Sequence, residues 1–261
     1  MNLNDGYMKN LSRLSTPSNP GWFKNWFDSS FYHQLYAHRS EKEAAHFIDN
    51  LIPILQPKED AKMLDLGCGA GRHSKHLATK GFHVTGLDLA KSSIQQASRF
   101  ERPNLQFFQH DMRVPFGMNY FDFAFSFFTS FGYFDSDAEN RQVINNIAQS
   151  LKSGGVVMMD YLNASYASKG LMGNETKEID GIVYHITRWM DNQHFYKKIA
   201  IELQSGKPFE YSERVAKLHI SDFESMFSDN GLKLLDIYGD YEMNEFVLSS
   251  SPRLIMIAEK G

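Results

Sequence analysis

A glycine-rich segment, with glycines at positions 67, 69 and 71, is the part of the sequence best suited to chemistry. The apolar run at 62–66 predicts a strand before it, and the run at 72–80 predicts a helix after it. Such a unit commonly binds nucleotides, because glycine allows close backbone approach to a ligand and a helix N-terminus favours negative charge. The dinucleotide pattern G-x-G-x-x-G would need glycine at position 72, where this chain has Arg72, so a nicotinamide dehydrogenase is disfavoured.

Three aspartates lie at or just beyond the ends of predicted strands, at equal intervals of 23 residues: Asp65 near the end of the first, Asp88 at the end of the second and Asp111 after the third. In a doubly wound sheet the carboxyl ends of the strands share one edge, where ligands bind. An ionised Asp88 would accept two hydrogen bonds from a ribose diol, and Asp111 would accept one from an adenine amino group. Asp65, beside the turn, would orient its backbone or face an ammonium group. The spacing therefore predicts a nucleoside site at this edge.

The elements that must position these residues alternate between strand and helix. Strands are predicted at 62–66, 82–88, 105–110, 120–128 and 156–161, with helices at 72–80, 92–100 and 137–151. A further helix, capped by Ser221 with Glu224, precedes two last strands at 232–238 and 253–258. This order predicts an α/β fold with a doubly wound, mostly parallel, seven-stranded Rossmann-like sheet whose last strand is antiparallel.

The remaining segments add to this domain. Residues 1–20 are polar and predict a flexible tail, and 21–58 predict a helical cap that begins with an aromatic cluster. Alternating patterns at 182–190, 195–203 and 209–217 predict a small antiparallel β insertion, called the lid below because of the resemblance described in the next paragraph. We therefore divide the chain into the tail, the cap, a cofactor-binding domain at 59–164 and 218–261, and the lid at 165–217.

Four motifs in this order resemble the class I S-adenosylmethionine-dependent methyltransferases. Residues 63–72 (Met-Leu-Asp-Leu-Gly-Cys-Gly-Ala-Gly-Arg) resemble motif I, and Asp88-Leu89 and His110-Asp111-Met112 resemble the segments that hold the ribose and the adenine. Residues 151–155 resemble the family's LKPGG turn, with Ser153 replacing proline. The resemblance is close over 61–163 and in outline over 219–259, and the lid is similar to that of glycine and sarcosine N-methyltransferases.

The resemblance implies S-adenosylmethionine as cofactor and a set of residues that hold it. The three glycines would line its methionine part, Phe127 would lie beneath the sulfonium and ribose, and Tyr36 and Arg39 would contact its carboxylate. The full set of cofactor-binding candidates is Tyr36, Arg39, Asp65, Gly67, Cys68, Gly69, Gly71, Arg72, Asp88, Leu89, Asp111, Met112 and Phe127.

Features that the sequence lacks narrow the expected reaction. The segment 126–130 lacks the Asn/Asp-Pro-Pro-Tyr motif of enzymes that methylate adenine or amides, and it contains no carboxylate that could bind a metal. The sole cysteine of the chain is Cys68, so no other cysteine is available for the covalent mechanism of pyrimidine methylation. We therefore expect metal-free N- or O-methylation of a small molecule by in-line displacement. Candidates for the acceptor pocket are Thr129, Ser130, Tyr133, Tyr161, Arg188 and Arg214, and the sequence identifies no general base. An inward arginine in the lid would indicate a carboxylate-bearing acceptor.

Composition limits the partners and the compartment. The chain has 261 residues and a formal net charge of −4, which disfavours nucleic acid as a partner. One cysteine fits a reducing cytoplasm, and no apolar run is long enough to span a membrane. Two alternatives stay open: a non-catalytic module that binds S-adenosylmethionine or S-adenosylhomocysteine, and a methyltransferase acting on RNA or protein. The oligomeric state is also open.

Overall fold

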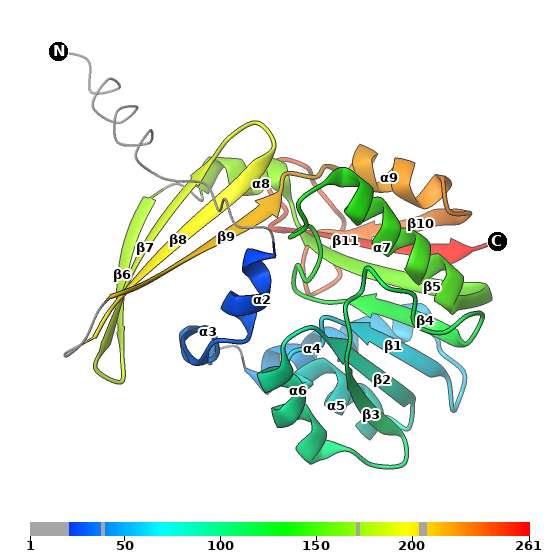
Figure 1. The fold of residues 1–261 in the computed structure, drawn as a ribbon. Coiled ribbons are helices and arrows are strands. Elements are labelled where there is room, and N and C mark those ends of the chain that lie inside the picture. The colour runs from blue at the N-terminus through cyan, green and yellow to red at the C-terminus, as the bar shows by residue number, and fades with distance from the viewer. Residues whose placement is uncertain (1–20, 38–39, 171–172, 204–207) are drawn as a thin grey trace.

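The computed structural model describes residues 21–37, 40–170, 173–203 and 208–261. The predicted tail at 1–20 and the cofactor candidate Arg39 lie outside these ranges. The described chain forms two β-sheets, a large one flanked by helices and a small one beside it (Figure 1). Within the described ranges no helix is both long enough and apolar enough to cross a bilayer.

The large sheet has seven strands in the order β10-β11-β5-β4-β1-β2-β3. Neighbouring strands from β3 to β5 are parallel, whereas β11 runs antiparallel to both β5 and β10. This arrangement confirms the predicted fold class. The strands are β1 (Lys62–Leu66), β2 (His83–Asp88), β3 (Leu105–Gln109), β4 (Phe121–Ser126), β5 (Leu151–Leu162), β10 (Leu232–Tyr238) and β11 (Arg253–Lys260).

Helices cover both faces of this sheet because its central strands are apolar on both sides. Met63 packs with the helices α4 and α5, whereas the next residue, Leu64, points to the opposite face and packs with α7 and α9. Ser40 caps α4 by accepting a hydrogen bond from the backbone N–H of Glu43. The helices are α4 (Glu41–Leu55), α5 (Arg72–Thr79), α6 (Lys91–Ala97) with the 3₁₀ turn η1 (Ser98–Phe100), α7 (Asp137–Ser150) and α9 (Ile220–Ser228).

The small sheet, here called the lid sheet, is antiparallel with the order β6-β7-β8-β9. It follows α8 (Ala164–Gly170) and consists of β6 (Gly173–Ile179), β7 (Ile182–Met190), β8 (His194–Glu202) and β9 (Phe209–Ala216). The sequence prediction omitted α8 and β6. β6 is an edge strand with mostly polar, exposed side chains, so it lacks the alternation of apolar residues that identified the other three.

Two short helices, α2 (Trp22–Phe27) and α3 (Ser30–Leu35), fasten the start of the described chain to the lid sheet (Figure 1). The ring of Trp26 lies 4.8 Å from that of Tyr211 on β9, and the Tyr184 hydroxyl on β7 donates a hydrogen bond to the side chain of Gln34 at 2.5 Å. The aromatic residues predicted as a cap thus pack against the inner face of this sheet.

Several predicted boundaries differ from the structure, and contacts explain two of them. β5 begins at Leu151, because Leu151 pairs with Phe121 before a register shift lets Val156 pair with Phe123. The last helix begins at Ile220, and its capping residue is His219, two positions before the predicted Ser221. The backbone N–H of His219 donates a hydrogen bond to the side chain of Asp222 at 2.7 Å.

Candidate active site

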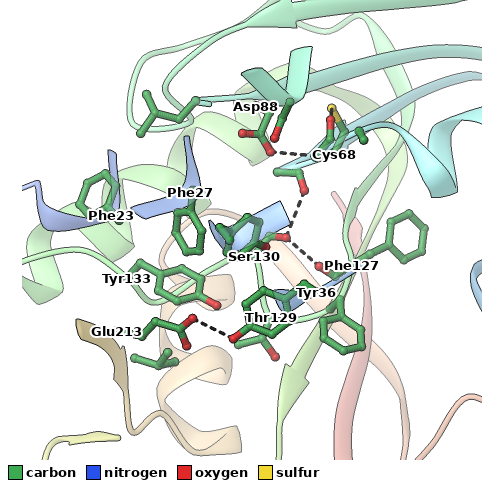
Figure 2. A pocket seen from close by; sticks show the side chains of 18 of the residues that line it. Phe23, Phe27, Tyr36, Cys68, Asp88, Phe127, Thr129, Ser130, Tyr133 and Glu213 are labelled. Carbon is green, nitrogen blue, oxygen red and sulfur yellow. Dashed lines mark hydrogen bonds between the residues drawn. The ribbon is translucent and has the colours of Figure 1, made fainter. Parts of the chain in front are cut away.

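A cavity of about 660 Å³ opens where the carboxyl ends of β1, β2 and β4 meet the lid sheet and helices α2 and α3. The cofactor candidates that line it are Tyr36, Gly67, Cys68, Gly69, Arg72, Asp88, Leu89, Asp111, Met112 and Phe127. The acceptor candidates that line it are Thr129, Ser130, Tyr133 and Arg188. Asp65, Gly71, Tyr161 and Arg214 do not line this cavity. Figure 2 shows Asp88 at one end of it and Glu213 at the other, with Ser130 between them.

The glycine turn needs its glycines for two different reasons. All three have positive φ (71°, 57° and 81°), a region that other residues enter at a cost. A Cβ atom at Gly67 would lie 2.5 Å from Cβ of Ser130, and one at Gly71 would lie 2.6 Å from the ring of Phe107, whereas one at Gly69 would meet nothing within 4 Å. Gly67 and Gly71 therefore allow close packing, and Gly69 leaves open space along the cavity.

Asp88 fixes the turn from the end of β2. Its Oδ2 accepts a hydrogen bond from the backbone N–H of Gly69, and its Oδ1 accepts one from Ala90, both at 2.8 Å. Burial raises the pKa of this carboxyl, and the two backbone donors oppose that rise. The carboxylate retains lone pairs for further donors in the cavity.

Asp111 is held by a residue that the sequence analysis missed. Nε of Arg113 donates to its Oδ1 at 3.0 Å, and Nη2 donates to its Oδ2 at 2.6 Å. Arg113 also pairs with Glu139 on α7. This guanidinium lowers the pKa of Asp111, so the carboxylate is ionised and fixed in orientation at the cavity. The sequence feature that could have indicated this ion pair is the opposite charge of Asp111 and Arg113, which stand two positions apart.

Asp65 lies behind the turn and outside the cavity. It is 1% exposed, and its Oδ2 accepts a hydrogen bond from the hydroxyl of Ser74 on α5 at 2.5 Å. Its Oδ1 is buried without a hydrogen-bond partner among the described residues. Burial, with a smaller contribution from the charge of Asp88, raises the pKa of Asp65 to about 7.

The segment after β4 forms the floor of the cavity and is backbone-strained. Phe128 and Thr129 have φ of 55° and 57°, although neither is glycine. The Ser130 hydroxyl bonds to the carbonyl oxygens of Phe127 at 2.8 Å and Gly67 at 3.2 Å, so it ties this floor to the glycine turn (Figure 2). The ring of Phe127 stacks on His73 at 4.2 Å.

A buried ion pair supports this strained turn from below. The side chain of Asp160, on β5, is 0% exposed and accepts a hydrogen bond from the backbone N–H of Phe128 at 2.8 Å. It pairs with Arg253 on β11, whose Nη2 in turn donates to the Thr129 hydroxyl at 2.8 Å. Neither residue was predicted from the sequence, because each is an ordinary polar residue near a strand end.

The predicted acceptor residues fall into two groups. Arg188 lines the cavity and its Nη2 donates to Glu175 at 2.7 Å. Arg214 instead pairs with Asp135 at 2.5 Å, and the hydroxyl of Tyr161 is buried against the carbonyl of Ala216 at 2.6 Å. Arg214 and Tyr161 thus make structural contacts outside the cavity.

The lid wall contains a polar cluster that the sequence analysis did not single out. Lys197 and Glu213 both line the cavity, and their side chains are 14% and 12% exposed. The Tyr36 hydroxyl donates to Oε1 of Glu213 at 2.8 Å, and Nζ of Lys197 donates to the same hydroxyl. Charged residues in an amphipathic strand usually face solvent, so no pattern in the sequence indicated that Lys197 and Glu213 point inward.

No cluster of three or more histidine, cysteine, aspartate or glutamate side chains with metal-binding geometry occurs in the described ranges. The predicted absence of a metal from the reaction stays a prediction.

The chain is similar in sequence to known methyltransferases. Residues 63–155 match the family model described as "Methyltransferase domain". YqeM of Bacillus subtilis (strain 168), a protein named as a methyltransferase, is 24% identical over 244 residues, which cover 89% of this chain and 96% of that protein.

Two solved structures share the fold over most of the chain. A structure titled as an S-adenosylmethionine-dependent methyltransferase from Clostridium acetobutylicum ATCC 824 has a TM-score of 0.74 at 19% identity, covering 88% of this chain and 96% of that one. CalS10 from Micromonospora echinaspora, titled as an amino pentose methyltransferase with S-adenosylmethionine bound, has a TM-score of 0.68 at 20% identity and covers 89% and 98%.

Proposed function

We propose that this chain, a class I methyltransferase by its fold and by the domain at residues 63–155, uses S-adenosylmethionine to methylate nitrogen or oxygen of a small molecule without a metal. The observation that carries the proposal is the joining of Asp88 to the open turn at Gly69 in one cavity. The volume of this cavity, about 660 Å³, lies within the range of about 300–1,000 Å³ that is typical of small-molecule sites.

The cavity fits this cofactor at one end. Asp88 would accept hydrogen bonds from the ribose hydroxyls, and the open space at Gly69 would admit the methionine part. Leu89 and Met112 would pack against the adenine, and Asp111, held by Arg113, would accept from its amino group. When bound, the cofactor supplies a sulfonium whose methyl group is already activated.

The chain's own residues then shield and orient the reactants. Phe27, Tyr36 and Tyr133 form aromatic walls between the cofactor end and the lid sheet (Figure 2). Such walls exclude water and tolerate a positive charge through cation–π contact. Ser130, tied to both the glycine turn and the β4 segment, keeps the floor in a fixed position relative to the turn.

Calorimetry on the purified protein tests the cofactor site. We expect micromolar dissociation constants for S-adenosylmethionine and S-adenosylhomocysteine and no binding of NAD. Asp88→Asn should weaken both by about 10- to 100-fold, since a hydrogen bond to a charged group contributes about 1.5–3 kcal/mol. Asp122→Asn is a matched control, because Asp122 lies on the same sheet, pairs with Lys152 and does not line the cavity. NAD binding, or equal effects of the two substitutions, would exclude the proposed site.

Turnover separates catalysis from binding alone. We expect methyl transfer to a small molecule that EDTA does not abolish and that depends weakly on salt concentration. Steep salt dependence with an RNA acceptor would instead favour a macromolecular substrate. Tight cofactor binding without any turnover would favour a binding module.

The single cysteine, Cys68, is buried and unpaired with another cysteine, consistent with a site of action in the reducing cytoplasm.

A further inference from the structure

The lid sheet presents one row of charged side chains to the cavity. Arg188 on β7 pairs in register with Lys197 on β8, and Lys197 pairs with Glu213 on β9. Residues directly opposite one another on neighbouring strands point to the same face of a sheet. All three line the cavity, so the row forms the wall opposite the cofactor end.

Glu213 stands out in this row because one of its oxygens retains acceptor capacity. Its Oε1 accepts hydrogen bonds from Nε1 of Trp26 at 2.7 Å and from the hydroxyl of Tyr36 at 2.8 Å. Its Oε2 lies 3.8 Å from Nζ of Lys197, beyond hydrogen-bond distance. A carboxylate offers about four lone-pair positions, so Oε2 can accept a donor from a molecule in the cavity.

The surroundings of Glu213 are those that bind an ammonium group. Nζ of Lys197 itself lies 4.5 Å from the centroid of the Tyr36 ring and donates to the Tyr36 hydroxyl. An aromatic ring and a carboxylate together stabilise a positively charged nitrogen. The positive charge of Lys197 also disfavours a second cation beside it, so it promotes loss of a proton from an amine bound there.

We propose that the methyl acceptor is an amine, and that Oε2 of Glu213 binds its nitrogen and receives its proton; this deepens the proposed function and rests on it. The ammonium form loses one proton to Glu213. The nitrogen lone pair then forms the N–C bond as the C–S bond breaks, and sulfur keeps the electron pair of the broken bond. The methylated ammonium leaves, and Glu213 returns its proton to solvent.

The base strength of the lid wall favours an amine over an alcohol. An alkyl ammonium has an ordinary pKa of about 10.4, and the nearby charge of Lys197 would lower it, whereas a hydroxyl is a much weaker acid. A carboxylate is far too weak a base to generate an alkoxide from a hydroxyl. Three histidines line the cavity outside the lid sheet: His33 bonds to Ser92, His73 stacks on Phe127, and His110 bonds to the carbonyl of Val114.

Matched pairs of acceptors test the inference directly. The full-length protein is incubated with tritium-labelled S-adenosylmethionine and pairs that share a carbon skeleton: benzylamine and benzyl alcohol, phenethylamine and 2-phenylethanol, cyclohexylamine and cyclohexanol, glycine and glycolate. We expect label transfer to at least one amine and to no alcohol. Transfer to an alcohol, or to no amine while the cofactor binds, overturns the amine assignment. Failure of cofactor binding would instead overturn the proposed function.

A pair of substitutions then tests Glu213 itself. In Glu213→Gln the amide oxygen still accepts from Trp26 and Tyr36, but the negative charge is gone. We expect KM for the best amine to rise at least 10-fold while cofactor affinity stays within 2-fold. Glu210→Gln is the control, since Glu210 is on the same strand, pairs with Lys198 at 2.8 Å and does not line the cavity. Equal KM values for the two variants would overturn the role of Glu213.

Discussion

The buried pair of Asp160 and Arg253 allows the sharpest prediction about stability. Asp160→Asn keeps the size of the side chain but removes the charge that compensates the guanidinium. The carboxylate accepts from Nε of Arg253 at 2.7 Å, from the backbone N–H of Phe128 at 2.8 Å and from the Tyr241 hydroxyl at 3.0 Å. Every one of these donors would face a weaker acceptor or an amide N–H.

The magnitude follows from burial. The side chain of Asp160 is 0% exposed and that of Arg253 is 17% exposed, so water can compensate little of the unpaired charge. Breaking a buried ion pair by removing one partner costs about 3–5 kcal/mol. At about 2–4 °C per kcal/mol for a chain of this size, we expect the melting temperature to fall by about 6–20 °C.

Urea unfolding followed by circular dichroism measures the loss, with Asp137→Asn as control. Asp137 pairs with Arg141 at the helix surface, where such a pair contributes about 0.5 kcal/mol or less. Adding Arg253→Met to Asp160→Asn should restore part of the stability, because no unpaired charge then remains buried. A loss below about 1 kcal/mol for Asp160→Asn, or a double variant less stable than the single one, would refute this reasoning.

Three further outcomes follow from the described contacts. Burial raises the pKa of Asp65 to about 7 in the folded state, against an ordinary value of 3.8, so the folded state holds this proton up to about pH 7. The stability of the wild type should therefore fall relative to that of Asp65→Asn as the pH rises from about 4 to 7. A difference between their urea midpoints that is the same at pH 4, 5.5 and 8 would contradict this. Gly71→Ala should lose about 2–5 kcal/mol in urea unfolding, since the new Cβ has positive φ and lies 2.6 Å from the Phe107 ring; a loss below 1 kcal/mol would mean that the turn can relax. Tyr161→Phe should lose about 1–3 kcal/mol in the same assay by leaving the carbonyl of Ala216 unsatisfied, and unchanged stability would show that the bond is dispensable.

The parts of the site that the sequence predicted are local in the chain. The glycine turn follows a strand directly, and Asp88 ends the neighbouring strand, so a short pattern and the rule that parallel strands end at one edge brought them together. Asp160 and Arg253 are 93 residues apart and meet only through the pairing of β5 with β11. Their contact depends on how β5 and β11 are aligned in the folded sheet, so no local sequence pattern indicated that the two residues form an ion pair.

The lid sheet shows a different reason for missed residues. Its strands alternate between two faces, and the sequence does not tell which face meets the cavity, so Arg188 and Arg214 were equally good candidates. Arg214 is one residue from Glu213 along β9, and neighbouring residues on a strand point to opposite faces. Choosing the wrong member of that adjacent pair explains why Glu213 was missed.

The attachment of α2 to β9 also constrains the order in which the protein assembles during synthesis. Trp26 leaves the ribosome before Glu213, its hydrogen-bond partner 187 residues later in the chain. At about 5–20 residues per second, the aromatic segment waits about 10–40 s for the strand that covers it. The large sheet can gather in the meantime, because β1 to β4 all lie between these two positions in the chain. Trp22, Phe23 and Phe27 can pack earlier, on Tyr133 and Phe134, so Trp26 is the aromatic residue of α2 whose cover depends on the late strand β9.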